Sequence, residues 1–275
     1  MRPIRHFLYA VLLIFSGFAP VLAQNSSHVK VELLGETTTI QPGGAVTVGL
    51  HFTLQKNWHV YWQNPGDSGQ APTLQWSLPE GFTVGEMQWP CPKKIFLSST
   101  LADYGYTQDV LLMVPLQAPA NLKAGHMVRL SATTHWLVCS EICIPGSAQL
   151  NLRLTVSKKA PKKSRNAFLF QKARKQLPLP MPEDWKAEGA LGAKEFRLSF
   201  NTGERYAKAL FIPLSPSQVD NAKAQKFEPS ASSFNLLLKR SDLLMENIKT
   251  LEGVLVVGDK KSDKSYQVSI PLTAY

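Results

Sequence analysis

Short segments in which apolar side chains recur at every second position constrain the fold of this chain more than any other feature. In Ala45–Leu54, for example, Val46, Val48 and Leu50 alternate with residues of the opposite face. Such alternation predicts half-buried β-strands, and turn sequences such as Gln41–Gly44 separate the segments. Many short strands divided by turns favour a β-sandwich over an α/β fold. We therefore predict an all-β protein.

The alternation is interrupted once, by residues 158–185. This stretch begins with basic residues and continues with a predicted helix over Asn166–Gln176, whose apolar side holds Phe168, Leu169 and Ala173. The proline-rich segment 177–182 then ends the helix. Alternation resumes afterwards, in a region without Cys or His. We expect a first domain over 24–157, a basic linker with a short helix over 158–185, and a second, smaller β-sandwich-like domain over 186–275.

The N-terminus has the pattern of a secretory signal peptide. A basic start with Arg2 and Arg5 precedes a mostly apolar run from His6 to Leu22, and Ala23 offers a cleavage site. The run is short for a membrane span of about 20 residues, which makes an uncleaved anchor the lesser alternative. We predict a signal peptide over 1–23, cleaved after Ala23. The mature protein is then exported to an oxidising compartment, where cysteines can pair.

The formal net charge of +10 is concentrated in two places. Arg2 and Arg5 belong to the predicted signal peptide, and eight basic residues lie between Lys158 and Lys175 without an intervening Asp or Glu. A solvated linker explains such a run, and docking near an anionic membrane surface or on an acidic partner is the alternative. No nucleic-acid-binding motif accompanies the charge, so we expect no nucleic acid as a partner.

Two of the three cysteines, Cys139 and Cys143, lie at the end of a predicted hairpin. Its strands are expected over Met127–Val138 and Gln149–Val156, and the short segment between them contains Ile144-Pro145-Gly146. Positions four apart in an extended strand are about 13 Å apart. A disulfide needs Cα atoms roughly 4.4–6.8 Å apart, so the chain must turn through 140–142 for a bridge to form. Such a bridge closes a tiny loop and stabilises the fold little. A redox-exchange pair, a static disulfide and a metal site that includes His135 all remain open at this point.

An ordered set of motifs surrounds the pair, namely Trp58–Gly69 (WHVYWQNPGDSG), Leu74–Trp76 (LQW), Met87–Lys94 (MQWPCPKK), Asp103–Tyr106 (DYGY) and Trp136–Pro145 (WLVCSEICIP). This set resembles the periplasmic N-terminal domain of the DsbD/ScsB thiol:disulfide interchange proteins, and most of all their ScsB-type branch. The resemblance covers residues 29–157 well and extends weakly beyond. It implies an immunoglobulin-like redox domain without a cofactor or metal. In that family the cysteine pair accepts electrons from a membrane-embedded partner domain and reduces periplasmic thioredoxin-like proteins.

The resemblance also implies roles for individual residues. Cys139 and Cys143 become the catalytic redox pair, beside an active-site aromatic at Tyr61. The segment Phe96–Tyr106 corresponds to a cap that shields the pair until a partner docks. Four further residues are expected around the pair: a capping aromatic, two neighbours of the active site, and a turn residue that is either a proton acceptor or simply solvated; these are Tyr104, His59, Asp103 and Glu141.

Two features depart from the family pattern. The chain ends at Tyr275, so we expect a separately encoded membrane thiol reductase as the electron donor of a periplasmic protein-disulfide reductase. Cys91 stands where related sequences carry a small residue, and it is either an inert side chain or a third thiol. The alternative function is a non-catalytic periplasmic adaptor, such as a copper-related one, in which the disulfide is structural.

Overall fold

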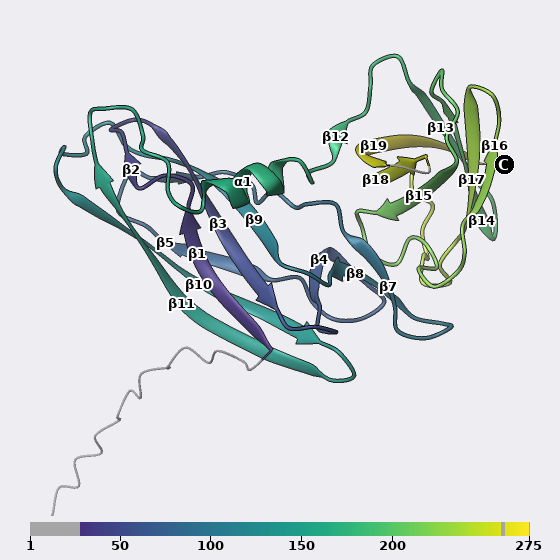
Figure 1. Cartoon of the computed structure of the whole chain (residues 1–275). Helices are drawn as coiled ribbons and strands as arrows, with labels where there is room; N and C mark the ends of the chain where they lie inside the picture. Colours follow the sequence, from purple (N-terminus) through teal and green to yellow (C-terminus); the bar gives the residue numbers. More distant parts are fainter. Residues whose placement is uncertain (1–27, 260–261, 275) are drawn as a thin grey trace, which may run out of the picture.

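The computed structural model describes residues 28–259 and 262–274, so the predicted signal peptide lies outside the described residues. Within these residues the chain forms two β domains, joined by a connector and one short helix (Figure 1). The predicted all-β fold class, an immunoglobulin-like sandwich followed by a second β domain, is confirmed. No helix in the described part of the chain is long and apolar enough to cross a membrane.

Two four-stranded sheets form the sandwich of the first domain. One sheet has the order β1-β3-β9-β6, with bounds Val29–Gly35, Ala45–Leu54, Val110–Gln117 and Thr83–Val84. The other has the order β2-β11-β10-β5, with bounds Thr39–Ile40, Cys143–Val156, Met127–Cys139 and Thr73–Ser77. Val48 and Leu50 of one sheet and Leu130 of the other are fully buried, as alternation predicts.

A third, small sheet connects the sandwich to the second domain. Its order is β4-β8-β7, with bounds Val60–Gly66, Ala102–Tyr106 and Lys93–Phe96. Figure 1 shows these strands between the sandwich and the second domain. The pairing of β4 with β8 shifts register between Tyr61 and Gly66. The last residues of β4 and the three that follow form a loop over Asn64–Gly69, which we call loop 64–69.

The long hairpin β10–β11 corrects one sequence prediction. The hairpin is present with its turn at 140–142, but its second strand begins at Cys143 and not at Gln149, so Pro145 and Gly146 pair with Leu137 and Trp136. Pro145 is tolerated because β11 pairs with β2 only at its far end, so no described strand needs its missing N–H. Glycine is needed at 146 because a Cβ there would lie 2.3 Å from the indole of Trp136. The indole can therefore cross the strand.

The connector after β11 is fixed to the first domain. The backbone N–H of Thr38 donates to Lys162 O, and the N–H of Ser164 donates to Glu36 O. Helix α1 (Ala167–Arg174) follows, and the Arg174 guanidinium donates to the Glu36 carboxylate through both terminal nitrogens. These contacts hold the connector and the helix against β1 and β3.

Helix α1 lies within the predicted range but turns a different side inward. Ala167, Phe170 and Ala173 are buried, and Phe170 packs against Leu111 and Met113 of β9. Phe168, which we expected on the apolar side, is 63% exposed. Side chains three positions apart share a helix face, and the face through 167, 170 and 173 leaves Phe168 outside. The segment after the helix contains Pro178 and ends it as expected.

The second domain is a curled sheet of the order β15-β18-β19-β13-β14-β17-β16. The bounds are Lys208–Pro213, Thr250–Gly258, Asp263–Ala274, Lys186–Leu191, Glu195–Asn201, Ser233–Lys239 and Lys226–Pro229, with β12 (Leu179–Pro180) paired to β19. Strand β19 pairs with β18 along most of its length and with β13 at its end. The sheet thus folds onto itself around a core that includes Phe196, Leu236 and Leu255.

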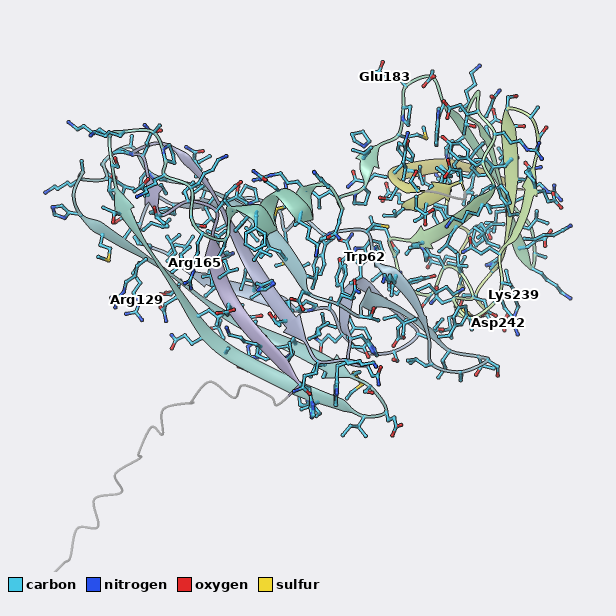
Figure 2. The ribbon with its side chains drawn as sticks, in the orientation of Figure 1. Trp62, Arg129, Arg165, Glu183, Lys239 and Asp242 are labelled. Atoms are coloured by element: carbon cyan, nitrogen blue, oxygen red, sulfur yellow. A yellow bond between two sulfur atoms is a disulfide. The ribbon has the colours of Figure 1, made fainter. Side chains whose placement is uncertain are left out.

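The two domains share a packed junction. Ile212 and Val254 of the second domain belong to the same apolar cluster as Trp62 and Tyr104 of the first. Figure 2 shows Trp62 where the domains meet. A cleft of about 620 Å³ borders this junction. The second domain is therefore in direct contact with strands β4 and β8.

Candidate functional site

Cys139 and Cys143 form a disulfide at the tip of the β10–β11 hairpin. Cys139 ends one strand, Cys143 begins the next, and their Cα atoms are 4.2 Å apart as direct cross-strand partners. The intervening turn closes with a hydrogen bond from Ser140 N–H to Ile142 O, of 3.0 Å. The chain therefore turns through 140–142, as the length of an extended strand requires for this bridge.

The two cysteines differ in access to solvent. Cys139 is 1% exposed, and its backbone N–H and C=O both pair with His59, at 3.0 and 2.9 Å. Cys143 is exposed. Because thiol–disulfide exchange requires a thiolate to approach a sulfur atom, Cys143 is the more accessible of the two for an incoming partner.

Tyr61 contacts the accessible cysteine. Its hydroxyl lies 3.6 Å from Cys143 Sγ in a hydrogen bond, while its ring is almost completely buried. Burial raises the pKa of Tyr61 above its usual value, so the hydroxyl keeps its proton near neutral pH. Gly69, with φ of +73°, lies against the ring so closely that a Cβ would be 2.0 Å from Tyr61 Cζ. Loop 64–69 therefore fixes the tyrosine beside Cys143.

Asp103 and His59 lie behind Tyr61. The Asp103 carboxylate is fully buried and accepts hydrogen bonds from Ser68 N–H (2.9 Å) and Ser68 Oγ (2.7 Å). His59 Nε2 lies 4.0 Å from Asp103 Oδ2, and the imidazole stands edge-on to the Tyr61 ring, 5.1 Å away. Burial lowers the pKa of His59, against the opposing effect of Asp103, so the imidazole favours its neutral form.

Strand alternation explains why these side chains meet. His59 and Tyr61 are two positions apart and point to the side of the cysteines, as does Asp103 of β8. Trp62 and Tyr104, one position further along each strand, point to the other side and stand edge-on to each other, 6.5 Å apart.

Tyr104 is therefore placed differently from the other expected site residues. It is fully buried, and its hydroxyl donates to Asn221 Oδ1 of the second domain at 3.0 Å. Burial also raises its pKa. This position makes Tyr104 part of the domain junction and does not support the expected role as the aromatic that caps the cysteines.

The segment expected to act as a cap forms the hairpin of β7 and β8. Three large apolar side chains at its tip are exposed to solvent, namely Phe96, Leu97 and Leu101. Ile142, beside Cys143, is 65% exposed as well. Glu141 is exposed in the turn between the cysteines. Ile142 is the neighbour of Cys143 in the chain, so an incoming partner protein would meet its exposed apolar side chain beside the disulfide.

Cys91 lies in a different environment, at the domain junction. It is a free, half-buried cysteine, and its N–H donates to Gln176 O at 2.8 Å. Burial raises the pKa of its thiol to about 11, and Ser265 of the second domain opposes this with a hydrogen bond. A thiol with so high a pKa is almost entirely protonated at neutral pH, which favours an inert side chain over a third reactive thiol.

Three residues of the site were not predicted from the sequence. Ser68 and Gly69 were named only as part of the motif Trp58–Gly69, although they hold Asp103 and Tyr61. Asn221 lies far along the chain, in a domain whose sequence offers no chemical motif, and nothing in the sequence pointed to it. Among the described residues, no group of three or more His, Cys, Asp and Glu side chains could hold a metal ion.

Comparison with known proteins gives two informative matches. The family described as "Thiol:disulfide interchange protein DsbD, N-terminal" matches residues 30–155. The crystal structure of the N-terminal periplasmic domain of ScsB from Proteus mirabilis is similar over 91% of this chain and 96% of its own length. That similarity has a TM-score of 0.67 at 17% sequence identity, so it concerns the fold.

Other comparisons are weaker. A protein of unknown function from Porphyromonas gingivalis aligns over 89% of this chain and 99% of its own, at 12% identity and a TM-score of only 0.25. No curated protein sequence matches the chain.

Proposed function

Since residues 30–155 form a DsbD/ScsB-like N-terminal domain, we propose that this protein is a periplasmic thiol–disulfide interchange protein. In this proposal the Cys139–Cys143 pair accepts two electrons from a separate membrane thiol reductase. It then delivers them to thioredoxin-like proteins of the periplasm. The protein is exported by its N-terminal signal peptide, cleaved after Ala23.

One observation carries the proposal: the disulfide lies at an exposed hairpin tip, with the Tyr61 hydroxyl 3.6 Å from the exposed Cys143. A bridge that closes so short a loop adds little to stability. An accessible sulfur beside a buried hydrogen-bond donor is instead suited to exchange, because the donor stabilises a thiolate.

The proposed reaction proceeds in two displacements. In the reduced protein the Cys143 thiolate attacks a sulfur of the partner's disulfide, a mixed disulfide forms, and the partner's other sulfur leaves as a thiolate. The Cys139 thiolate then attacks Cys143 Sγ, which forms the internal disulfide and releases the partner's second thiolate. Two electrons pass to the partner, and the membrane reductase returns the pair to its dithiol form.

The neighbouring side chains are proposed to stabilise the thiolate and to accept a proton. The Tyr61 hydroxyl donates a hydrogen bond to the Cys143 thiolate and lowers the pKa of that thiol. Neutral His59, near Asp103, is placed to accept a proton in the buried part of the site. Glu141 is a solvated turn residue that partners can contact.

Partner capture tests the proposal directly. We expect Cys139→Ser to accumulate a mixed disulfide between Cys143 and a thioredoxin-fold protein, identified by mass spectrometry after thiol trapping in the periplasm. Cys91→Ser, which leaves the pair intact, is the control and accumulates none. If neither Cys139→Ser nor Cys143→Ser captures a thioredoxin-fold protein, the relay is rejected and a non-catalytic adaptor with a structural disulfide is the better function.

The basic connector is proposed to keep the protein near an anionic membrane surface. Its charges at Lys158, Lys159, Lys162, Lys163, Arg165, Lys172 and Lys175 are all exposed, whereas Arg174 pairs with Glu36. Each basic residue near an anionic bilayer contributes about 1 kcal/mol, and salt screens the attraction. We expect co-sedimentation with phosphatidylglycerol vesicles at low salt and none with phosphatidylcholine. Replacement of the four lysines at 158–163 by Gln is expected to abolish it, and unchanged binding rejects the role.

A further inference from the structure

We propose that the second β domain positions the cysteine site, and that Asn221 is the positioning residue through which it acts. The inference rests on the proposed function and adds a role for a domain that contains no Cys or His of its own. It follows from a series of hydrogen bonds and contacts between Asn221 and Cys143.

Asn221 joins the second domain to two parts of the first. It lies between β15 and β16, and it is only 3% exposed. Its Nδ2 donates to Asp67 Oδ1 at 2.8 Å, and its Oδ1 accepts from the Tyr104 hydroxyl at 3.0 Å. One side chain therefore holds both loop 64–69 and strand β8.

Asp67 transmits this contact to the strand that carries Asp103. The second carboxylate oxygen of Asp67 accepts from Ala102 N–H at 2.8 Å, and the N–H of Asp67 donates to Ala102 O at 3.1 Å. Gly66, with φ of +96°, lets the loop approach so closely that a Cβ would lie 2.6 Å from Ala102 O. Loop 64–69 is thus fastened to β8 immediately before Asp103.

The other end of the loop reaches the cysteine. Ser68 donates two hydrogen bonds to Asp103, and Gly69 lies against the Tyr61 ring, whose hydroxyl contacts Cys143 Sγ. The position of Tyr61 therefore depends on the loop, and the position of the loop depends on Asn221.

A second contact from the same domain supports this dependence. Asn64, at the start of the loop, is 1% exposed, and its Nδ2 donates to Pro213 O at 2.8 Å. Its Oδ1 accepts from Gly66 N–H at 3.1 Å. A buried amide left without its hydrogen-bond partner lowers the stability of a conformation. Without the second domain, the loop would therefore lose the hydrogen bonds that hold it at Asn64 and at Asp67.

A purely structural role for Asn221, in which it only holds the two domains together, would give the same contacts but would not affect the pKa of Cys143. If Asn221 only holds the domains together, its loss lowers stability and leaves the Cys143 thiol unchanged. If it positions Tyr61, its loss weakens the hydrogen bond to the thiolate and raises the pKa of Cys143. The pH dependence of thiol reactivity separates these roles.

The test measures alkylation of Cys143 by iodoacetamide against pH in the reduced full chain, followed by peptide mass spectrometry. The midpoint is the pH at which alkylation of Cys143 reaches half of its maximal rate. Tyr61→Phe, which removes the hydroxyl, is expected to give the largest upward shift of this midpoint. We expect Asn221→Ala to shift the midpoint in the same direction by about half a pH unit, about a threefold change in acidity. Tyr104→Phe removes only the hydroxyl that Asn221 accepts from, and gives a smaller shift in a variant that preserves the packing.

Asn235→Ala is the matched control. Asn235 Oδ1 accepts from Ser199 Oγ at 2.8 Å within the second domain, away from loop 64–69. In Asn235→Ala, the midpoint of Cys143 alkylation should equal that of the unaltered protein. The inference is overturned if Asn221→Ala has the unaltered midpoint or a lower one, or if Asn235→Ala shifts equally. Iodoacetamide reports on the Cys143 thiol without any partner protein. Failure to capture a thioredoxin-fold protein would therefore reject the proposed function, whereas the alkylation midpoints would still decide the role of Asn221.

Discussion

The hairpin tip and the domain junction both carry cysteine, yet they place it in opposite settings. At the tip, Cys143 is exposed beside a tyrosine hydroxyl and the apolar side chain of Ile142. At the junction, Cys91 is half-buried, and burial raises the pKa of its thiol. The surroundings of each cysteine, rather than the residue type, therefore decide which sulfur can exchange. We therefore expect thiol exchange at the hairpin tip and a contribution to stability from the domain junction.

The largest contrast is expected in thiol reactivity. Because the pKa of Cys91 is about 11, only about one thousandth of this thiol is ionised at pH 8. In the reduced protein we expect iodoacetamide to label Cys143 at least about a hundredfold faster than Cys91. The rate at Cys91 should rise about tenfold per pH unit between pH 8 and 10. Equal labelling of the two thiols in peptide mass spectra would contradict the expected difference in reactivity.

Stability should show the reverse contrast. Trp62 is buried at the junction, so Trp62→Ala is expected to lower the free energy of unfolding by about 3–5 kcal/mol. Ile142 is exposed at the tip, and Ile142→Ala should change it by less than about 0.5 kcal/mol. Urea unfolding measures both variants. A loss at the tip as large as that at the junction would contradict the assignment of stability to the junction.

Two glycines with nearly equal φ separate backbone strain from an effect on the site. Gly69 (φ +73°) lies against Tyr61, whereas a Cβ added at Gly203 (φ +72°) would meet nothing within 4 Å. Alanine at Gly203 should cost about 1 kcal/mol in unfolding free energy, since L-residues disfavour this conformation. Alanine at Gly69 should cost more, because its methyl group also meets the buried Tyr61 ring. Gly69→Ala alone should also raise the pH midpoint of Cys143 alkylation, because the new methyl displaces the tyrosine. A shift in Gly203→Ala would mean that general destabilisation moves the midpoint.

Among the variants expected to lower stability, the smallest effect is expected at Arg174 of helix α1. Arg174 lowers the pKa of Glu36 below its usual value of 4.5, so this pair stabilises the fold above about pH 4.5 and loses its effect as the pH falls through the lowered value. Arg174→Ala should lower stability by about 0.5–1 kcal/mol at pH 7, and the difference should vanish in acid. The alkylation midpoint of Cys143 should stay unchanged, because this pair touches neither the tip nor the junction.

The sequence predicted those parts of the molecule that depend on local pattern. Alternation marked the strands of both domains, and the spacing of Cys139 and Cys143 required the turn at 140–142. Alternation began the second strand of this hairpin at Gln149, six residues too late, because proline and glycine usually mark turns. Here both lie within the strand: Pro145 needs no N–H donor at its position, and Gly146 leaves room for the indole of Trp136.

Features that depend on contacts between distant segments could not be predicted. Tyr104 carries the same aromatic signal as Tyr61, and only the side of the strand to which it points decides that it faces Asn221. Asn221 itself is an ordinary polar residue until the second domain packs onto loop 64–69. The prediction that Phe168 faces the core was wrong because a short helix has several faces with apolar side chains. The face that packs against β9 is the one that carries Phe170.

The reduction potential of the Cys139–Cys143 pair distinguishes an exchanging disulfide from a structural one. It is measured by equilibrating the full chain in dithiothreitol or glutathione redox buffers and counting the two thiols by mass spectrometry. An exposed bridge that closes a short loop and exchanges with partners should have a potential above about −300 mV. A potential well below about −300 mV, where structural disulfides lie, would contradict the claim that this pair exists to exchange electrons.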